Sequence, residues 1–203
     1  MNILGRASGT KEQALHWFSS RADSSYIESD YRSLKTIIGA YQEIGERTGL
    51  DWFLALAQMA HETGNLRSFW SLRPRRNPAG IGCDGNPKAF DGDGKPGAFN
   101  TERQQWEHGI SFETWANDSV PAHIGRLLAY ALPIGVGNPA QLKIISQALS
   151  YRTFPDKARG SAQTFVQLGR IHNKSGFGWA SPGGKYGERI AAIAIQMRRN
   201  IDE

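Results

Sequence analysis

The amino-acid sequence predicts a mainly α-helical domain with a lobe of irregular loops that has room for a small β-hairpin. Apolar residues recur at helical spacing in the first and last thirds of the chain. Between them, residues 72–109 are rich in glycine, proline, asparagine and aspartate, which favour turns. With 203 residues and no linker or internal repeat, the chain fits one domain with a substantial core.

Apolar periodicity and end signals predict a series of helices. Thr10 is placed to cap the first, with Gln13 three residues later as in a capping box. The predicted helices outside the centre of the chain span residues 10–21, 31–47, 119–132, 141–151, 162–171 and 187–201. We therefore divide the chain into N-terminal helices (1–49), a buried helix (50–70), a loop lobe (71–112) and C-terminal helices (113–203).

The central predicted helix is almost entirely apolar and ends on a carboxylate. Across residues 52–60 Gln58 is the only polar side chain, so we expect most of the helix circumference to be buried. Asp51 is placed to cap its start and Gly64 to end it. Glu62 lies one turn after Gln58, where apolar surroundings and the negative end of the helix dipole raise the pKa of a carboxyl group. Such a group suits general acid catalysis, and the plain alternative is a glutamate that points into solvent.

The same residues argue against a zinc hydrolase. His61 and Glu62 begin like the His-Glu-x-x-His motif, but Asn65 stands where the second histidine is needed. The other histidines are scattered without the spacing of metal ligands. Cys83 is the single cysteine, so no disulfide forms within the chain. We therefore expect neither a metal ion nor an organic cofactor.

The chain is basic, with a net charge of +5 and a pI of about 9.5. This favours acidic partners such as nucleic acid or an anionic bacterial envelope. The densest basic stretch, residues 73–76, holds three arginines, and no nucleic-acid-binding motif accompanies it, so we expect no nucleic-acid partner. The sequence has no apolar run that fits a transmembrane segment and no apolar N-terminal stretch that fits a secretion signal.

Three tryptophans fall in or beside loops near the glycine-rich segments: Trp70, Trp115 and Trp179. A loop tryptophan can stack on the apolar face of a sugar ring, and it can also pack at the edge of the core. Composition favours packing over sugar binding for each of them.

Four short blocks follow one another along the chain. They read Ala-Gln-Met-Ala-His-Glu-Thr-Gly at 57–64, Arg-Asn-Pro-Ala-Gly-Ile-Gly at 76–82, Phe-Glu-Thr-Trp at 112–115 before a helix, and Trp-Ala-Ser with Tyr-Gly at 179–187. In this order they resemble the glucosaminidase domain of bacterial and phage cell-wall hydrolases. The resemblance covers residues 50 to about 195, and the first helices are placed only by their helical character.

The resemblance implies a lysozyme-like fold and an endo-β-N-acetylglucosaminidase. Such an enzyme cleaves the β-1,4 bond between N-acetylglucosamine and N-acetylmuramic acid in peptidoglycan. Glu62 matches the family's general acid, and Tyr186 matches a tyrosine that lines its cleft. Asn77, Gly80 and Ile81 match the loop at the cleft floor.

Three tryptophans and one histidine complete the expected substrate-binding set. His61 neighbours the acid and is expected to orient it or the sugar. The tryptophans are Trp70, Trp115 and Trp179. The chain also departs from the family, because Ser181 stands where its members often have aspartate.

The second catalytic group stays open. Relatives take a second carboxylate from the variable lobe, and here we favour Glu102 over Glu107, Asp91 and Asp93. A separation of about 5 Å between Glu102 and Glu62 would suit retention of configuration, and about 6.5–9.5 Å would suit inversion. In a third route the acetamido group of the substrate attacks, and Tyr186 steadies the developing charge.

Two other interpretations also stay open. A muramidase or lytic transglycosylase on the same fold would use the same glutamate to cut the other glycosidic bond. A non-catalytic cell-wall-binding or phage structural protein would keep the fold without the chemistry. In each case we expect a monomer whose partner is the peptidoglycan glycan strand, acting on the cell wall in the periplasm or outside the cell. Without a visible signal peptide, we expect a phage lysin or a virion-associated hydrolase.

Overall fold

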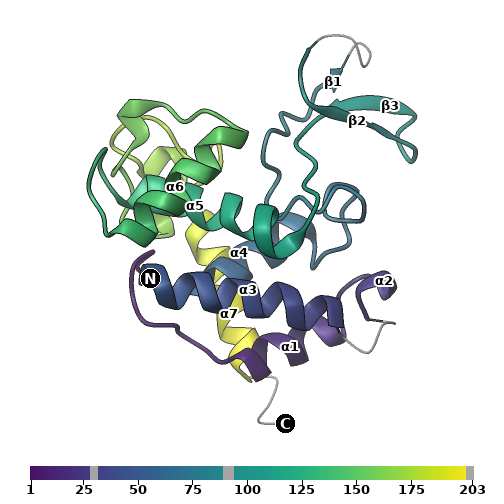
Figure 1. The fold of residues 1–203 in the computed structure, drawn as a ribbon, viewed down its shortest axis with the longest axis horizontal. Coiled ribbons are helices and arrows are strands. Elements are labelled where there is room, and N and C mark those ends of the chain that lie inside the picture. The colour runs from purple at the N-terminus through teal and green to yellow at the C-terminus, as the bar shows by residue number, and fades with distance from the viewer. Residues whose placement is uncertain (28–31, 89–93, 200–203) are drawn as a thin grey trace.

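The computed structural model describes residues 1–27, 32–88 and 94–199. Within them the fold is mainly α-helical with one small antiparallel sheet (Figure 1). The α-helices are α1 (Lys11–Ser19), α2 (Ser24–Ile27), α3 (Arg32–Thr48), α4 (Trp52–Thr63), α5 (Val120–Ala131), α6 (Pro139–Tyr151) and α7 (Tyr186–Arg199). The strands are β1 (Pro87–Lys88), β2 (Gly97–Asn100) and β3 (Gln105–His108). The predicted mainly α-helical class is confirmed, and the lobe holds a hairpin with a third short strand.

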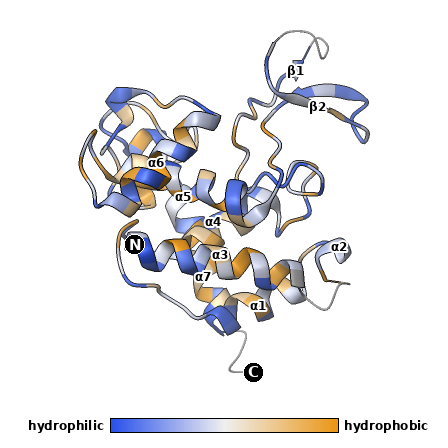
Figure 2. Cartoon of the chain, viewed as in Figure 1, coloured by the Kyte–Doolittle hydropathy of each residue, from blue (hydrophilic) through white to orange (hydrophobic). Residues whose placement is uncertain are grey.

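Helix α4 lies at the centre of the helical body, in contact with α3 and α7. Every residue across 52–60 is buried, and Figure 2 shows the apolar character of this helix among more polar neighbours. The side chain of Asp51 accepts a hydrogen bond from the Leu54 backbone N–H at 3.2 Å. Gly64 ends the helix with a left-handed φ of 56°, a conformation that glycine adopts without strain. Both predicted end signals are therefore confirmed.

Helix α5 is buried along its whole length. It packs against α6 on one side and α3 on another, and its cap Ser119 has no capping side-chain bond. The buried residues include His123 and Arg126, two polar side chains in an otherwise apolar helix. A buried polar group is costly unless it has a partner, so these two positions need an explanation beyond packing.

The sheet lies in a lobe that projects from the helical body (Figure 1). Strand β3 is central, with β1 and β2 antiparallel on either side of it. The carboxylate of Glu107 on β3 accepts hydrogen bonds from the Trp70 indole at 3.2 Å and from Arg103 at 3.1 Å. The bond from Trp70 ties the lobe to the segment that follows α4, whereas the bond from Arg103 lies within the lobe.

The predicted helix over 162–171 is wrong. The structure has only two short 3₁₀ turns there, at Val166–Leu168 and Arg170–His172. The backbone of this segment forms hydrogen bonds with residues outside it instead. The Phe165 N–H donates to the Met1 carbonyl at 3.1 Å, and the Arg170 N–H donates to the Ala180 carbonyl at 2.9 Å. These bonds compete with the helical pattern that apolar spacing alone suggests.

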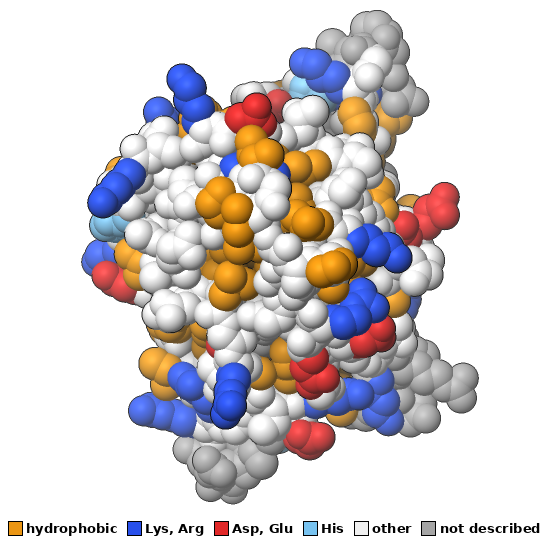
Figure 3. Space-filling view, turned by 60° about the vertical axis from the view of Figure 1, so that its left-hand side comes forward, with side chains coloured by type: hydrophobic (Ala, Val, Ile, Leu, Met, Phe, Trp, Pro, Cys, Tyr) orange, Lys and Arg blue, Asp and Glu red, His pale blue; other side chains and the backbone are white. Residues whose placement is uncertain are grey.

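Charge is unevenly distributed on the surface. On the face shown in Figure 3, apolar side chains gather near the middle, and basic and acidic side chains lie mostly around them. None of the helices in the described parts of the chain is long and apolar enough to span a membrane.

Candidate active site

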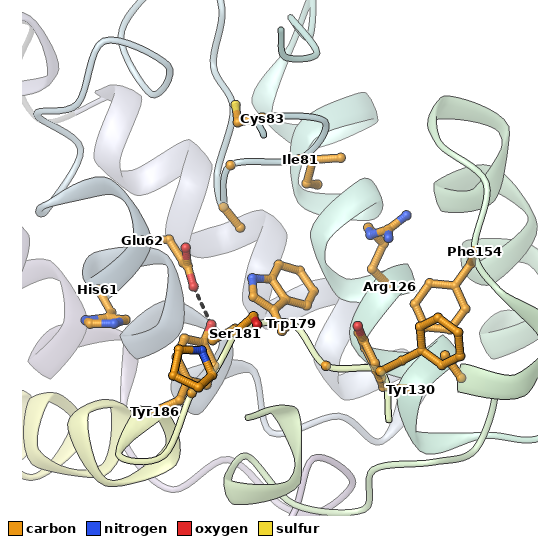
Figure 4. A pocket seen from close by; sticks show the side chains of 18 of the residues that line it. His61, Glu62, Ile81, Cys83, Arg126, Tyr130, Phe154, Trp179, Ser181 and Tyr186 are labelled. Carbon is orange, nitrogen blue, oxygen red and sulfur yellow. Dashed lines mark hydrogen bonds between the residues drawn. The ribbon is translucent and has the colours of Figure 1, made fainter. Parts of the chain in front are cut away.

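A cleft of about 1020 Å³ opens beside the C-terminal end of α4 (Figure 4). Its walls come from the end of α4, the loop at 79–83, one face of α5, the segment 152–158 and the loop that leads into α7. Distant parts of the sequence therefore meet around one cavity. Its volume is at the upper end of the range for small-molecule sites, which suits an extended ligand.

Glu62 lies at one end of the cleft, in the last turn of α4. Burial raises the pKa of its carboxyl group above the ordinary value. The Tyr186 hydroxyl and the Trp179 indole act in the opposite direction by favouring the charged form, but burial is the larger effect. The group therefore holds its proton to higher pH than an exposed glutamate, and the predicted rise in pKa is confirmed in direction.

A chain of buried hydrogen bonds leads away from this carboxyl group. The Tyr186 hydroxyl donates to Glu62 Oε1, and Gln58 Nε2 donates to the Tyr186 hydroxyl at 2.7 Å. His123 Nε2 lies 3.0 Å from Gln58 Oε1, and the Tyr41 hydroxyl lies 2.6 Å from His123 Nδ1. Four helices, α3, α4, α5 and α7, thus contribute to one continuous network.

All hydrogen bonds in this network donate in the same direction, from Tyr41 toward Glu62. Gln58 uses its amide N–H toward Tyr186, so its carbonyl oxygen must accept from the His123 Nε2–H. Complete burial lowers the pKa of His123 to about 3, so the imidazole is neutral and its Nδ1 is an acceptor. The Tyr41 hydroxyl therefore donates to Nδ1. Each bond fixes the next, and the network holds the Tyr186 hydroxyl against Glu62.

The loop at 77–81 forms one wall and is held by a single buried amide. Asn77 Nδ2 donates to the carbonyls of Ile81 at 2.8 Å and Ile110 at 2.9 Å. Its Oδ1 accepts from the backbone N–H groups of Ala79 at 3.2 Å and Ile81 at 2.9 Å. Asn77 therefore shapes the wall, whereas Gly80 and Ile81 line it.

The glycine-rich loop before α7 packs tightly behind the cleft. A Cβ at Gly178 would lie 2.5 Å from the backbone nitrogen of Arg170, so only glycine fits this close approach. The loop brings Trp179 into the middle of the cleft wall, where its ring lies 5.4 Å from the His123 ring and 6.2 Å from the Tyr130 ring. These contacts fix the indole between the two ends of the cleft (Figure 4).

The far end of the cleft is basic and aromatic. Arg126 projects from α5 toward the cavity beside Phe154 and Tyr130 (Figure 4). Its guanidinium lies 5.2 Å from the centre of the Phe154 ring and donates to the Arg152 carbonyl at 3.1 Å. Burial, together with the nearby Arg152 charge, lowers the pKa of Arg126 to about 10. Arg152 itself is exposed and also lines the cleft.

The structure brings six of the sequence-predicted site residues to the cleft: His61, Glu62, Gly80, Ile81, Trp179 and Tyr186. The ring of His61 contacts the ring of Tyr186 edge to face, with centroids 5.6 Å apart. Burial, and to a smaller degree the Arg189 charge, lowers the pKa of His61. Ser181 also lines the cleft.

Four other predicted residues lie outside the cleft lining. Trp70 bonds to Glu107, Asn77 is used within its own loop, and Trp115 is buried edge to face against Tyr26. Glu102 is exposed in the turn between β2 and β3. Two further candidates for the second carboxylate, Asp91 and Asp93, lie outside the described residues.

Sequence reasoning missed most of the supporting residues: Tyr41, His123, Arg126, Tyr130, Arg152 and Phe154. One signal was present in the sequence. His123 and Arg126 are polar residues inside an apolar helical pattern, as Gln58 is in α4. A polar side chain in such a place must find a partner, although the sequence does not say which.

No family model matches the chain, and no curated protein matches its sequence. It is similar to the catalytic domain of the autolysin Auto from Listeria monocytogenes, with 12% identity and a TM-score of 0.44 over 97% of this chain and 90% of the other. It is also similar to an N-acetylmuramoyl-L-alanine amidase from Staphylococcus aureus, with 14% identity and a TM-score of 0.41 over 94% of this chain and 44% of the other.

Proposed function

We propose that the protein is a peptidoglycan hydrolase that cleaves the β-1,4 bond between N-acetylglucosamine and N-acetylmuramic acid, with Glu62 as general acid. The observation that carries the proposal is a carboxyl group of raised pKa at one end of a long cleft, held by a buried hydrogen-bond network. A protonated carboxyl group in such a place is able to protonate the oxygen of a glycosidic bond.

The rest of the cleft suits a glycan. Trp179 offers an indole surface in the middle of the wall, and Tyr130 offers a ring near the far end. Flat aromatic surfaces bind the apolar faces of sugar rings. Three of the four sequence blocks that resemble the glucosaminidase domain contribute residues to the cleft lining, at 61–62, 79–81 and 179–186, which supports the same substrate class.

We favour the route in which the acetamido group of the substrate supplies the second function. Glu62 is the only carboxylate among the described lining residues, so no second protein carboxylate faces it there. In this route the Glu62 proton passes to the leaving oxygen, the bond from the anomeric carbon breaks, and the acetamido oxygen bonds to that carbon. The Glu62 carboxylate then takes a proton from the water that opens the cyclic intermediate.

Tyr186 and its network have a defined part in this route. The Tyr186 hydroxyl donates to one oxygen of Glu62, which leaves the other oxygen to carry the proton toward the substrate. When the proton leaves, the same hydrogen bond stabilises the carboxylate that remains. Gln58 keeps the hydroxyl in place throughout.

The test is a digest of purified peptidoglycan by the wild-type protein and by the Glu62→Gln variant. The products are reduced and identified by mass spectrometry, because reduction labels the sugar at each new chain end. We expect reducing N-acetylglucosamine ends from the wild type and none from the variant. A Glu102→Gln variant is the matched control for the loss of a carboxylate, and we expect it to cleave like the wild type.

Three results would contradict the proposal. Reducing N-acetylmuramic acid ends or anhydro-muramic ends would keep Glu62 as the acid but assign the muramidase or transglycosylase reaction. Loss of cleavage in Glu102→Gln would indicate that Glu102 is the second catalytic carboxylate. Binding to cell walls with no released ends from the wild type would assign the non-catalytic role.

A further inference from the structure

Arg126 is a buried cation that has no carboxylate partner in the described parts of the chain. The residue is 9% exposed, and among the described residues its guanidinium donates one hydrogen bond, to the Arg152 carbonyl. Among the described residues no carboxylate oxygen lies within ion-pair distance of it. The charged group that acts most strongly on it is another arginine, Arg152.

Such an arrangement is unusual for a residue kept only for packing. A guanidinium has five N–H donors, and the Arg152 carbonyl uses one of them. Buried charges in proteins are normally paired, because an unpaired charge loses its hydration without compensation. Arg126 lines a cavity to which the described residues contribute four Lys or Arg side chains and one carboxyl group: Arg126, Arg152, Lys185, Arg189 and Glu62.

We propose that Arg126 and Arg152 form a subsite that binds a carboxylate of the substrate, at the opposite end of the cleft from Glu62. This subsite rests on the proposed function for its substrate class. Peptidoglycan strands carry carboxylates on the lactyl group of muramic acid, where no peptide is attached, and on the stem peptides. A guanidinium fork matches the two oxygens of a carboxylate.

The surroundings of Arg126 explain how it is held ready for that ligand. The Phe154 ring lies under the guanidinium, and the Tyr130 ring packs edge to face against Phe154 with centroids 4.7 Å apart. The aromatic support fixes the direction of the fork without neutralising its charge. Arg152, exposed at the rim, adds a second charge that draws an anion toward the site.

Trp179 separates the two ends of the cleft (Figure 4). A sugar that stacks on this indole would lie between the general acid and the arginine pair. The subsite therefore selects strands that carry an acidic substituent on the sugar beyond the one that reacts. A neutral N-acetylglucosamine oligomer would fill the same cleft without meeting this requirement.

The experiment measures binding rather than cleavage, in proteins that all carry Glu62→Gln. Isothermal titration calorimetry compares three probes: a neutral N-acetylglucosamine tetramer, a peptidoglycan tetrasaccharide without peptides, and the same tetrasaccharide with stem peptides. The measured quantity is the ratio of affinities for the acidic and neutral probes. We expect the Glu62→Gln protein to prefer an acidic probe, and added Arg126→Met to reduce this ratio about tenfold or more.

Two further variants keep the test decisive. Arg152→Gln changes an exposed side chain and cannot act by disturbing the core, and we expect a smaller fall in the ratio. Arg47→Gln removes the same charge from the exposed end of α3, outside the cleft lining, and we expect no change. The two acidic probes distinguish the lactyl carboxylate from the stem carboxylates.

Two outcomes would overturn the subsite. The first is an equal loss of affinity for acidic and neutral probes, which would mean that Arg126 has a structural role. The second is the absence of any preference for acidic probes before Arg126 is changed. An Arg126-dependent preference for acidic strands in these variants, together with no reducing ends released from peptidoglycan by the wild-type protein, would keep the subsite and overturn the proposed hydrolase.

Discussion

The two ends of the cleft bury ionisable groups in opposite ways. At one end Glu62 is linked through Tyr186 and Gln58 to a hydrogen-bond chain that runs into the core. At the other end Arg126 has one backbone carbonyl, an aromatic ring and a neighbour of the same charge. The first group has hydrogen-bond partners within the protein, as the proposed general acid requires, whereas the second has no counter-charge among the described residues, and a ligand could supply one.

The largest expected effect is on the reaction rate, where substitutions at the two ends of the cleft should change different kinetic constants. We predict that Glu62→Gln lowers kcat by about 10²–10⁴-fold, because the general acid is lost. Arg126→Met should act mainly on KM for acidic strands, by about tenfold, because it removes a binding contact made before the reaction. Steady-state rates on soluble peptidoglycan strands check both values.

The same rate measurements can contradict the separate roles of Glu62 and Arg126. A fall in kcat from Arg126→Met that matches the fall from Glu62→Gln would place the arginine in the chemical step. An unchanged kcat in Glu62→Gln would remove the glutamate from it.

The next largest effect concerns the hydrogen-bond chain at the acid end. We predict that His123→Ala lowers the free energy of unfolding by about 3 kcal/mol, because it leaves a cavity and leaves Gln58 and Tyr41 without their shared partner. Urea unfolding measures the change. His16→Ala on α1 is the matched control, since His16 is exposed, and it should change stability by less than about 0.5 kcal/mol.

The binding ratio for acidic and neutral probes should survive in His123→Ala, because Arg126 is untouched. A loss of stability below about 1 kcal/mol would contradict the network as a cooperative unit.

The smallest effect is a difference in how stability depends on pH. The folded-state pKa of Glu62 is raised, so above the unfolded value of about 4.3 the unfolded chain releases a proton that the folded protein retains. The free energy of unfolding therefore falls as pH rises from this value, until pH passes the folded pKa. Glu62→Gln should remove that fall, as thermal melts from pH 4 to pH 8 would show.

Arg126 should behave differently in the same melts. Its pKa is lowered to about 10, so it is charged in both the folded and unfolded states at every pH of the series. The cost of burying its charge is then constant, and Arg126→Met should raise stability by about 1 kcal/mol across the whole range. A gain that changes between pH 4 and pH 8 would contradict this assignment.

Local signals in the sequence were enough to predict most helices of the helical body. The apolar run at 52–60, the cap at Asp51 and the glycine at 64 predict α4 and the position of Glu62 correctly. The rise in the Glu62 pKa also follows from its place in the last turn of an apolar helix. These features depend on neighbours in sequence, and that is why they could be predicted.

The prediction that was wrong and the residues that were missed both depend on contacts between segments that are far apart in the sequence. The helix expected over 162–171 does not form, because its backbone bonds to Met1 and Ala180. The contact between His123 and Gln58 joins residues 65 positions apart. A polar residue in an apolar helix indicates that a partner exists, but only the fold, which brings side chains of α4, α5 and α7 into contact, shows which residue it is.

The most direct test of the account is a crystal structure of the Glu62→Gln variant with an intact peptidoglycan tetrasaccharide. We predict that a glycosidic oxygen lies within hydrogen-bond distance of the side chain at position 62, that a sugar stacks on Trp179, and that a substrate carboxylate contacts Arg126. A glycan bound elsewhere, or one whose carboxylates all point away from Arg126 into solvent, would contradict it.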